Sequence, residues 1–505
     1  MFMPFRYLLL LTCLFLVFSC KNEMSTIDAT QKPNVLFIIA DDLNCDLGTY
    51  GHPMVQSPYM DKLAAEGLVF ENAHCQYPLC GPSRASLMTG LYADQTKIKQ
   101  NRIYVRQTVP DVVTLGQKFR EVGYNAVRIG KIYHYDNPGS IGTSSFDDVY
   151  TWDYVFNPYG KDKEEEHKIE GIVKNWNGGD LSWHAADATD SELTDGIGAQ
   201  LAVDELKKFA KNGENFFLAV GLYRPHVPFV APKKYFDLYN KEEVTVPDYD
   251  DAYLKTIPRK AAQTLRDKKN QINLPDSIAR IVLQAYYASN SFVDAQLGTI
   301  LNALKETGLD KNTYVVFTSD HGYHMGERGH YQKRTLFDNA TRVPLIISGP
   351  NIPSSTRNKT PVELIDLYPT LMDLTQNSTP SFVQGQSLKS LFDPSAINSY
   401  KSEGALTQLY DGYTLKTPEF RITRWPEDQA YAYELYDLQN DPEEMINLAQ
   451  QSAYSSLLDS LKNHLESKIA FANKKPQGIG LQVEGIKAMR KPKMKRFLTP
   501  KNGQE

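Results

Sequence analysis

The segment that most constrains the fold is residues 34–40, Asn-Val-Leu-Phe-Ile-Ile-Ala, which is almost continuously apolar. A strand of this kind has no polar face, so it must be covered on both sides, as in the interior of a parallel sheet. Further apolar runs occur at residues 125–129, 216–222, 313–319 and 343–348. Together with the helical patterns between them, these runs predict an α/β fold with a mostly parallel sheet and helices on both faces.

Helical patterns are found between or after the strand runs, at residues 57–68, 83–91, 277–306 and 363–374. The pattern changes after about residue 395, where short strands with polar alternation and then an amphipathic helix at residues 453–472 are expected. The short strands fall within residues 404–425 and 430–437. We therefore predict a main domain over residues 33–395 and a smaller C-terminal α+β subdomain over residues 396–505, which ends in a basic tail.

The composition allows a large core and gives no sign of a nucleic-acid partner. The chain has 505 residues, of which 41% are hydrophobic and 23% charged, and these fractions are ordinary for a globular protein. Its net charge of −5 does not favour binding to a polyanion such as DNA or RNA.

The N-terminus has the pattern of an export signal. Arg6 precedes an apolar stretch at residues 7–18, which is shorter than the roughly 20 residues that span a bilayer. The stretch ends in Val-Phe-Ser-Cys at residues 17–20, which resembles a bacterial lipobox. We expect a signal peptide over residues 1–19 and a polar tether over residues 20–32. Lipid on Cys20 would then be the only membrane attachment of an exported bacterial lipoprotein, in the periplasm or at the outer membrane or cell surface. An ordinary cleaved signal peptide is the alternative.

The residues that most narrow the function are 79–90, Leu-Cys-Gly-Pro-Ser-Arg-Ala-Ser-Leu-Met-Thr-Gly. Average residue usage gives Cys-x-Pro-x-Arg by chance in roughly one chain in a hundred of this length. Followed by Leu-x-Thr-Gly, it resembles the signature of formylglycine-dependent (type I) sulfatases. The resemblance implies that a formylglycine-generating or anaerobic sulfatase-maturating enzyme oxidises Cys80 to the aldehyde formylglycine (3-oxoalanine). One hydroxyl of the hydrated aldehyde would attack sulfur, the other would later expel sulfate, and Arg84 would hold the hydrate.

Two acidic pairs follow buried strand runs and are candidate metal ligands. Asp41-Asp42 follows the first run and Asp320-His321 follows the run at residues 313–319. Carboxyl ends of parallel strands form one edge of a sheet, where ligands bind in open α/β folds. Three carboxylates suit Ca²⁺, or less well Mg²⁺, better than zinc, although a single Asp at a strand end is more often a turn former or helix cap. Both segments resemble sulfatase metal sites, and this implies one Ca²⁺ bound by these four residues and Cys80.

Four further side chains match sulfatase segments. Lys131 and His134 lie in Gly-Lys-Ile-Tyr-His, His226 lies in Arg-Pro-His-Val-Pro-Phe, and Lys333 follows Gly-Glu-Arg-Gly. The resemblance implies that the two lysines bind sulfate oxygens, that His134 orients the diol or takes its proton, and that His226 is the acid for the leaving oxygen. Each of these residues alone would more often be a surface or loop residue.

The resemblance extends over about residues 33–448 and is closest to iduronate-2-sulfatase-like bacterial sulfatases, because of His321 and the three segments above. It implies an alkaline-phosphatase-like fold and removal of O-sulfate from sulfated oligosaccharides, such as glycosaminoglycan or ulvan fragments. The 2-O-sulfate of a uronate or similar sugar is the expected target. The alternatives are a phosphate or phosphonate ester hydrolase of the alkaline phosphatase superfamily and a non-catalytic glycan-binding lipoprotein.

Two smaller questions stay open at the level of sequence. A basic group could bind a carboxylate or a second sulfate, or could simply be a solvated loop; it consists of Lys97, Lys99, Arg102 and Arg106. Cys45 and Cys75 could form a disulfide after export, but sequence does not determine the pairing.

Overall fold

The computed structural model describes residues 32–173, 179–393, 395–396 and 400–490. The predicted signal peptide, the Cys20 lipidation site and all of the tether except Lys32 lie outside the described residues, as does the end of the basic tail. Within the described part, no helix is both long and apolar enough to cross a lipid bilayer. Cys45 and Cys75 are free thiols, so the optional disulfide is not formed.

The central sheet has nine strands within the described residues, and its middle is parallel, as predicted. Strand β1 (Asn34–Asp41) pairs in parallel with β7 (Phe216–Pro225) on one side and with β9 (Thr313–Ser319) on the other. Strand β3 (Asn125–Gly130) extends the parallel part beyond β7, and β4 (Tyr154–Phe156) is the edge strand. The carboxyl ends of β9, β1, β7 and β3 therefore lie along one edge.

The other half of the sheet contains an antiparallel strand. Strand β12 (Arg342–Ser348) runs antiparallel to both β9 and β2 (Gly67–His74). The predicted helix at residues 57–68 is too long, because helix α1 (Pro58–Glu66) ends where β2 begins at Gly67 with no intervening loop. The sequence analysis missed β2 for this reason. Two short strands, β13 (Thr356–Asn358) and β14 (Val362–Glu363), pair in parallel with β2.

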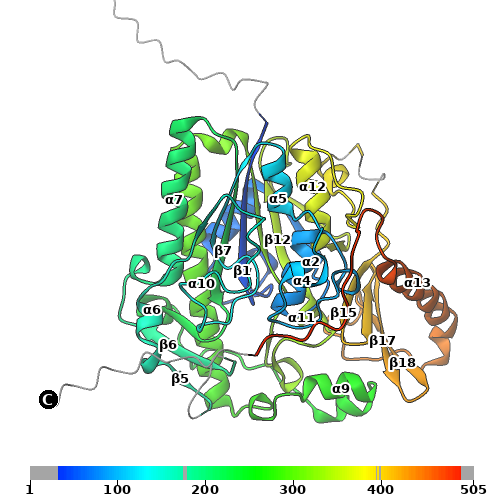
Figure 1. Cartoon of the computed structure of the whole chain (residues 1–505). Coiled ribbons are helices and arrows are strands. Elements are labelled where there is room, and N and C mark those ends of the chain that lie inside the picture. Colours follow the sequence, from blue (N-terminus) through cyan, green and yellow to red (C-terminus); the bar gives the residue numbers. More distant parts are fainter. Residues whose placement is uncertain (1–31, 174–178, 394, 397–399, 491–505) are drawn as a thin grey trace, which may run out of the picture. The chain divides into compact units, whose positions relative to one another are not determined.

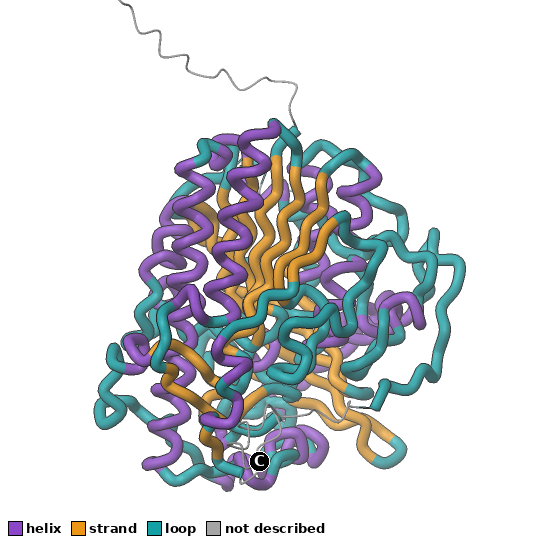
Figure 2. The backbone as a smooth tube through the Cα atoms, turned by 60° about the vertical axis from the view of Figure 1, so that its left-hand side comes forward, coloured by secondary structure: helices purple, strands orange, loops and turns teal. Residues whose placement is uncertain are grey.

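One face of the sheet is covered by α1, α7 (Thr194–Asn212) and α10 (Asp276–Glu306). Successive residues of a strand point to opposite faces, and in β1 the side chains of Leu36 and Ile38 join the core under these helices. Figure 1 shows α7 and α10 side by side to the left of β1, and Figure 2 shows helices flanking the strands.

The opposite face is covered by α2 (Cys80–Thr89), α5 (Leu115–Glu121) and α12 (Leu367–Leu374), to the right of β1 in Figure 1. Phe37 and Ile39 of β1 belong to this second core. Covering both faces explains why the strand runs have no polar face, and it confirms the predicted layers.

The C-terminal part is a separate four-stranded antiparallel sheet with one long helix, as expected for an α+β subdomain. The strands are β15 (Ala405–Leu409), β16 (Gly412–Lys416), β17 (Phe420–Glu427) and β18 (Ala430–Asp437) in sequential order. Helix α13 (Ser455–Asn473) packs its apolar side on this sheet.

The remaining elements are short and mostly lie in the connections. They are α3 (Ala93–Thr96), α4 (Val105–Thr108), α6 (Lys161–Glu164), α8 (Lys233–Phe236), α9 (Arg259–Leu265), α11 (Asp338–Thr341), β5 (Glu170–Gly171), β6 (Ser182–Ala186), β8 (Phe229–Pro232), β10 (His324–Met325) and β11 (Tyr331–Gln332).

Candidate active site

The polar residues predicted at strand ends do meet at one edge of the sheet. Asp41 ends β1, and Asp42 follows it directly. Asp320 and His321 come directly after β9, and His226 follows β7. Lys131 follows β3. Its backbone can lie this close to β7 because residue 221 is a glycine: a Cβ there would be 1.9 Å from the Lys131 carbonyl oxygen.

Three cations bind the three carboxylates in the interior. Arg84 donates from Nε to Asp320 Oδ2 at 2.9 Å and from Nη2 to Asp41 Oδ1 at 3.1 Å. Lys131 donates to Asp41 Oδ2 and Lys333 donates to Asp42 Oδ1. We call this set, with His321, the strand-end cluster. Arg84 also donates hydrogen bonds to the carbonyl oxygens of residues 131 and 132, so it positions the cluster, and its contact with a hydrated aldehyde stays a prediction.

Cys80 lies against this cluster at the first residue of α2, one turn before Arg84. Its Sγ is 3.2 Å from Lys333 Nζ, 3.3 Å from His321 Nε2 and 3.8 Å from Asp42 Oδ1. The side chain is buried, and burial raises the pKa of the thiol well above its usual value despite the nearby Lys333. The thiol is therefore neutral at ordinary pH and is a weak nucleophile.

Part of the cluster has the geometry of a cation site. Ligand atoms of Asp42, Cys80, Asp320 and His321 lie within 4.8 Å of one another, and Asp41, Asp42, Cys80 and His226 form an overlapping group. Asp42 Oδ2 is buried with no hydrogen-bond partner, and burial raises the pKa of this carboxyl to about 7 although Lys333 opposes the shift. A buried carboxylate oxygen without a partner fits a bound cation.

His321 is oriented as a metal ligand would be. Its Nδ1 lies 2.9 Å from the Gly322 carbonyl oxygen, which can only accept, so Nδ1 carries the proton. The unprotonated Nε2 then faces Asp42 Oδ1 at 3.4 Å and Asp320 Oδ2 at 3.6 Å. Burial lowers the pKa of His321 to about 4, which keeps Nε2 available.

The other two histidines lie at the cavity above the cluster. His226 donates from Nδ1 to the Val227 carbonyl oxygen at 2.6 Å, so its Nε2 is free and faces Asp42 Oδ2 at 3.7 Å. His134 has no hydrogen bond from either ring nitrogen, and its Nε2 is 3.5 Å from Asp136 Oδ1. Burial lowers the pKa of both rings, that of His134 to about 4. Both are therefore neutral bases.

Comparison with known proteins decides the family. The sulfatase family model matches residues 33–378, and the model described as N-sulphoglucosamine sulphohydrolase, C-terminal, matches residues 326–470. The chain belongs to the sulfatase family. A Formosa agariphila sulfatase is 33% identical over 489 residues, covering 91% of each chain. Mouse iduronate 2-sulfatase is 31% identical over 86% of this chain and 94% of its own. An ulvan-active sulfatase from Formosa agariphila is 28% identical over 90% of this chain and 85% of its own.

Solved structures agree with the fold of this sulfatase. Phosphonate monoester hydrolase from Silicibacter pomeroyi superposes with a TM-score of 0.73 at 21% identity, over 88% of this chain and 96% of that chain. The architecture is thus the predicted alkaline-phosphatase-like one. The relatives and the family model together identify the protein as a sulfuric ester hydrolase.

A cavity of about 190 Å³, which we call the reaction cavity, opens above the strand-end cluster. Of the predicted site residues, Asp42, His134, His226 and Lys333 line it, whereas Cys80 lies beneath Lys333. Several of its wall residues were not predicted from the sequence, because they lie in loops without a periodic pattern or, for Gln332, in the two-residue strand β11. They are Asn101, Asp136, Asp267, Lys268, Gln332 and Arg334.

The basic group of the sulfatase does not form a free patch. Arg102 forms a bidentate ion pair with Asp136 at 2.8–3.0 Å, and it alone of the four lines the reaction cavity. Arg106 pairs with Asp148 at 2.8 Å. Lys97 and Lys99 form their own ion pairs with Glu484 and Asp94, at 2.8 and 2.7 Å. These four ion pairs hold loops together, so the sulfatase must attract anions with other side chains.

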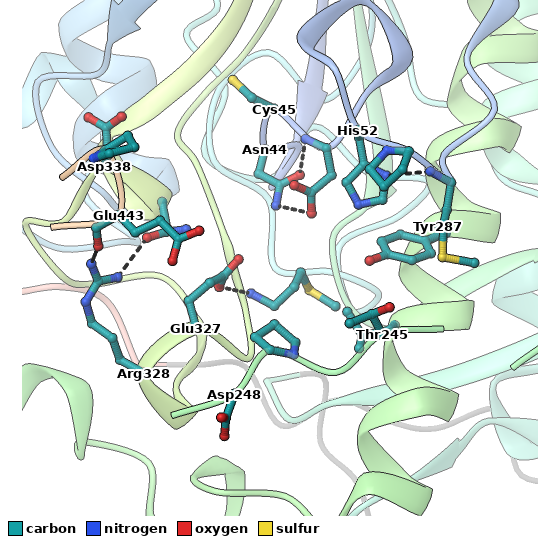
Figure 3. A pocket seen from close by; sticks show the side chains of 18 of the residues that line it. Asn44, Cys45, His52, Thr245, Asp248, Tyr287, Glu327, Arg328, Asp338 and Glu443 are labelled. Atoms are coloured by element: carbon teal, nitrogen blue, oxygen red, sulfur yellow. Dashed lines mark hydrogen bonds between the residues drawn. The ribbon is translucent and has the colours of Figure 1, made fainter. Parts of the chain in front are cut away.

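A second and larger cavity of about 1040 Å³ lies on the other side of the loop that follows β1 (Figure 3). Asn44, His52, Glu327 and Arg328 are among its lining residues. None of the predicted catalytic or metal residues lines it. Size therefore does not identify the active site of the sulfatase, whereas the chemistry of the strand ends does.

Proposed function

We propose that this sulfatase removes O-sulfate from sugars of polysaccharide-derived oligosaccharides, with the 2-O-sulfate of a terminal uronate as the expected target. The observation that carries the proposal is the position of Cys80, within 3.3 Å of both Lys333 and His321 beneath the reaction cavity. The names of the two relatives, an iduronate 2-sulfatase and an ulvan-active sulfatase, support glycosaminoglycan or ulvan fragments as the substrate class.

Cys80 is the proposed nucleophile position after oxidation to formylglycine. Its Sγ marks where an oxygen of the hydrated aldehyde would lie. The hydrate would supply a hydroxyl nucleophile where the buried thiol is neutral. Lys333 and Lys131 would stabilise negative charge there, since both are held in place by carboxylates of the strand-end cluster.

A single Ca²⁺ is the proposed metal. Asp41, Asp42, Asp320 and His321 would hold it together with the oxygen at position 80, and hard oxygens form the majority of this set. When bound, the cation would polarise a sulfate oxygen. The three carboxylates already face Arg84, Lys131 and Lys333, so two further positive charges would favour an anionic ester at the cavity floor.

Proton transfer is assigned to the histidines of the cavity. His226 has its Nδ1–H fixed by a carbonyl, so Nε2 is the atom that would first take up a proton and then donate it to the leaving oxygen. His134 has two free ring nitrogens and lies near Asp136, and we assign it to the nucleophile side.

The test is a panel of sulfated oligosaccharides, a phosphate monoester and a phosphonate monoester, assayed for release of sulfate or for ester cleavage. We expect sulfate release by the wild type and none above background by Cys80→Ala, with Cys45→Ala as the matched thiol control. Mass spectrometry of residues 80–84 reports the conversion of Cys80. Preferential cleavage of the phosphorus esters would favour the phosphatase-type alternative, and unchanged release by Cys80→Ala would refute the proposed nucleophile.

Export as a lipoprotein is a second part of the proposal. It is supported by the apolar stretch and the Cys20 motif in the sequence. Labelled fatty acid should be incorporated by the wild type and by Cys45→Ala but not by Cys20→Ala. Equal labelling of all three, or labelling of none, would contradict lipid on Cys20.

A further inference from the structure

One cation in the wall of the reaction cavity has no carboxylate partner. Lys268 donates from Nζ to the carbonyl oxygen of Gly179 at 2.6 Å and to Gln332 Oε1 at 2.5 Å, and both acceptors are neutral. Within the described residues, no carboxylate oxygen lies within 4.0 Å of this nitrogen. The side chain is half-buried and lines the cavity.

The other cations of the same wall are all paired. Lys333 binds Asp42. Arg102 binds Asp136 with two parallel hydrogen bonds, and Arg334 lies 3.0 Å from Asp267. A ligand that entered the cavity with a second negative charge would have to displace a carboxylate from any of these three, but not from Lys268.

The surroundings of Lys268 are short of negative charge. Burial, together with the charges of Lys333 and Arg334, lowers its pKa to about 8, while the more distant Asp180 and Asp42 act in the opposite direction. Gln332, which also donates to the Gly179 carbonyl at 3.0 Å, fixes the ammonium group. An anion placed beside Nζ would relieve the repulsion and form a charge-assisted hydrogen bond.

We infer that Lys268 binds a second anionic group of the substrate, a carboxylate or a second sulfate, while the sulfate to be hydrolysed lies over Cys80. The inference deepens the proposed function and rests on it. It predicts that this sulfatase discriminates against neutral sulfated sugars, and it places part of that discrimination outside the reacting centre. Lys268 would then act on substrate binding rather than on the chemical step.

The test compares paired substrates that differ only in the second charge. One pair is a 2-O-sulfated uronide and its methyl ester, and the other is a disulfated hexose and its monosulfated counterpart. For the wild type, kcat/KM should be higher for the charged member of at least one pair. In Lys268→Met this ratio should fall by about tenfold or more, mostly through KM, because a hydrogen bond to a charged group is lost. Lys268→Arg should keep part of the ratio, and the exposed neighbour variant Lys269→Met should keep all of it.

A second measurement does not depend on turnover. The affinity of the Cys80→Ala protein for the free uronate, measured by calorimetry, should fall by about tenfold when Lys268→Met is added. A ratio that falls for the uronide pair assigns the site to a carboxylate, and one that falls for the disulfated pair assigns it to sulfate. An unchanged ratio in an active Lys268→Met enzyme would overturn the inference alone. A wild type that releases sulfate from neither pair would overturn the proposed function instead.

Discussion

The strand-end cluster and a second buried charge network differ in whether every carboxylate oxygen has a hydrogen-bond donor. The second network joins the segments before and after β11 to the C-terminal sheet, and we call it the C-terminal joint. In it, Arg421 and the backbone N–H of Asp338 each donate to one oxygen of Glu444, and Arg328 lies 3.8 Å from that carboxylate. Both guanidinium groups also lie against the ring of Phe337, at 4.3 Å for Arg328 and 5.0 Å for Arg421.

The carboxylates show the difference. Both oxygens of Glu444 are occupied by protein donors, whereas Asp42 Oδ2 has none. The guanidinium groups of the joint lie against aromatic rings, and Arg328 also lines the larger cavity, whereas Asp42 borders the reaction cavity. A network whose carboxylate oxygens all have donors stabilises a contact between segments, while one with a free carboxylate oxygen can bind a ligand. The comparison teaches that neither buried charge nor a neighbouring cavity alone marks an active site; a buried carboxylate oxygen without a donor beside a cavity does.

Removing a cation from the strand-end cluster should affect activity most. We expect Lys333→Ala to lower kcat/KM for sulfate release by about 10³-fold, because charge stabilisation next to the nucleophile position is lost. The buried Asp42 carboxylate loses its cation, so the free energy of unfolding should also fall, and kcat/KM is compared per folded molecule. Lys311→Ala on the surface is the control, and a loss below tenfold would remove Lys333 from the reaction.

Removing the anion from the C-terminal joint should affect stability. Glu444→Gln leaves two buried guanidinium groups without their carboxylate, and we expect the free energy of unfolding to fall by about 3 kcal/mol. Per folded molecule, kcat/KM should stay within about threefold of the wild type. The neighbouring Glu443→Gln is a matched control, since its side chain is exposed. Equal effects of the two variants would mean that the joint contributes no stability.

Removing a bound metal with a chelator should also distinguish the two networks, through a smaller change in the free energy of unfolding. If Asp42 holds a cation, calcium at about 100 times its dissociation constant adds about 2.7 kcal/mol to stability, and a chelator removes it. Thermal unfolding with and without chelator measures this. The shift should persist in Glu444→Gln and vanish in Asp42→Asn. An identical shift in Asp42→Asn would place the metal elsewhere.

The smallest effect concerns a buried carboxylate that belongs to neither network. Asp294 of α10 accepts hydrogen bonds from the backbone N–H groups of Tyr59 and Met60 at the start of α1, and burial raises its pKa to about 7. The folded state therefore holds this proton more tightly than the unfolded state. Its contribution to stability is full below about pH 4 and is lost as pH rises to about 7.

The check is denaturant unfolding at pH 5 and pH 8. The wild type should lose about 2.5 kcal/mol more than Asp294→Asn over this interval, since the amide does not ionise. Asp310→Asn, in the short 3-10 helix before β9, serves as the control. Parallel slopes for all three proteins would mean that Asp294 keeps an ordinary pKa.

The sequence predicted the part of the site that follows from strand periodicity. Asp41, Asp42, Asp320, His321, Lys131 and His226 follow apolar runs, and parallel strands bring such ends together. It did not predict Lys268, which lies in a polar loop whose position depends on α9 and on the long-range contact with Gln332. Nor did it predict a role for Glu444. Its partner Arg421 is 23 residues away, and only the folded joint brings the two together.

The burial of Cys80 constrains the order of events in the life of each molecule. Its side chain is 1% exposed, in the first turn of a helix and beneath Lys333. An oxidising enzyme would have to reach this sulfur and hold the residues on both sides of it, and the folded protein gives no such access. If Cys80 is oxidised to formylglycine as proposed, the oxidation would have to happen on a nascent or still extended polypeptide. A molecule that folds before it is oxidised keeps its thiol for as long as it stays folded.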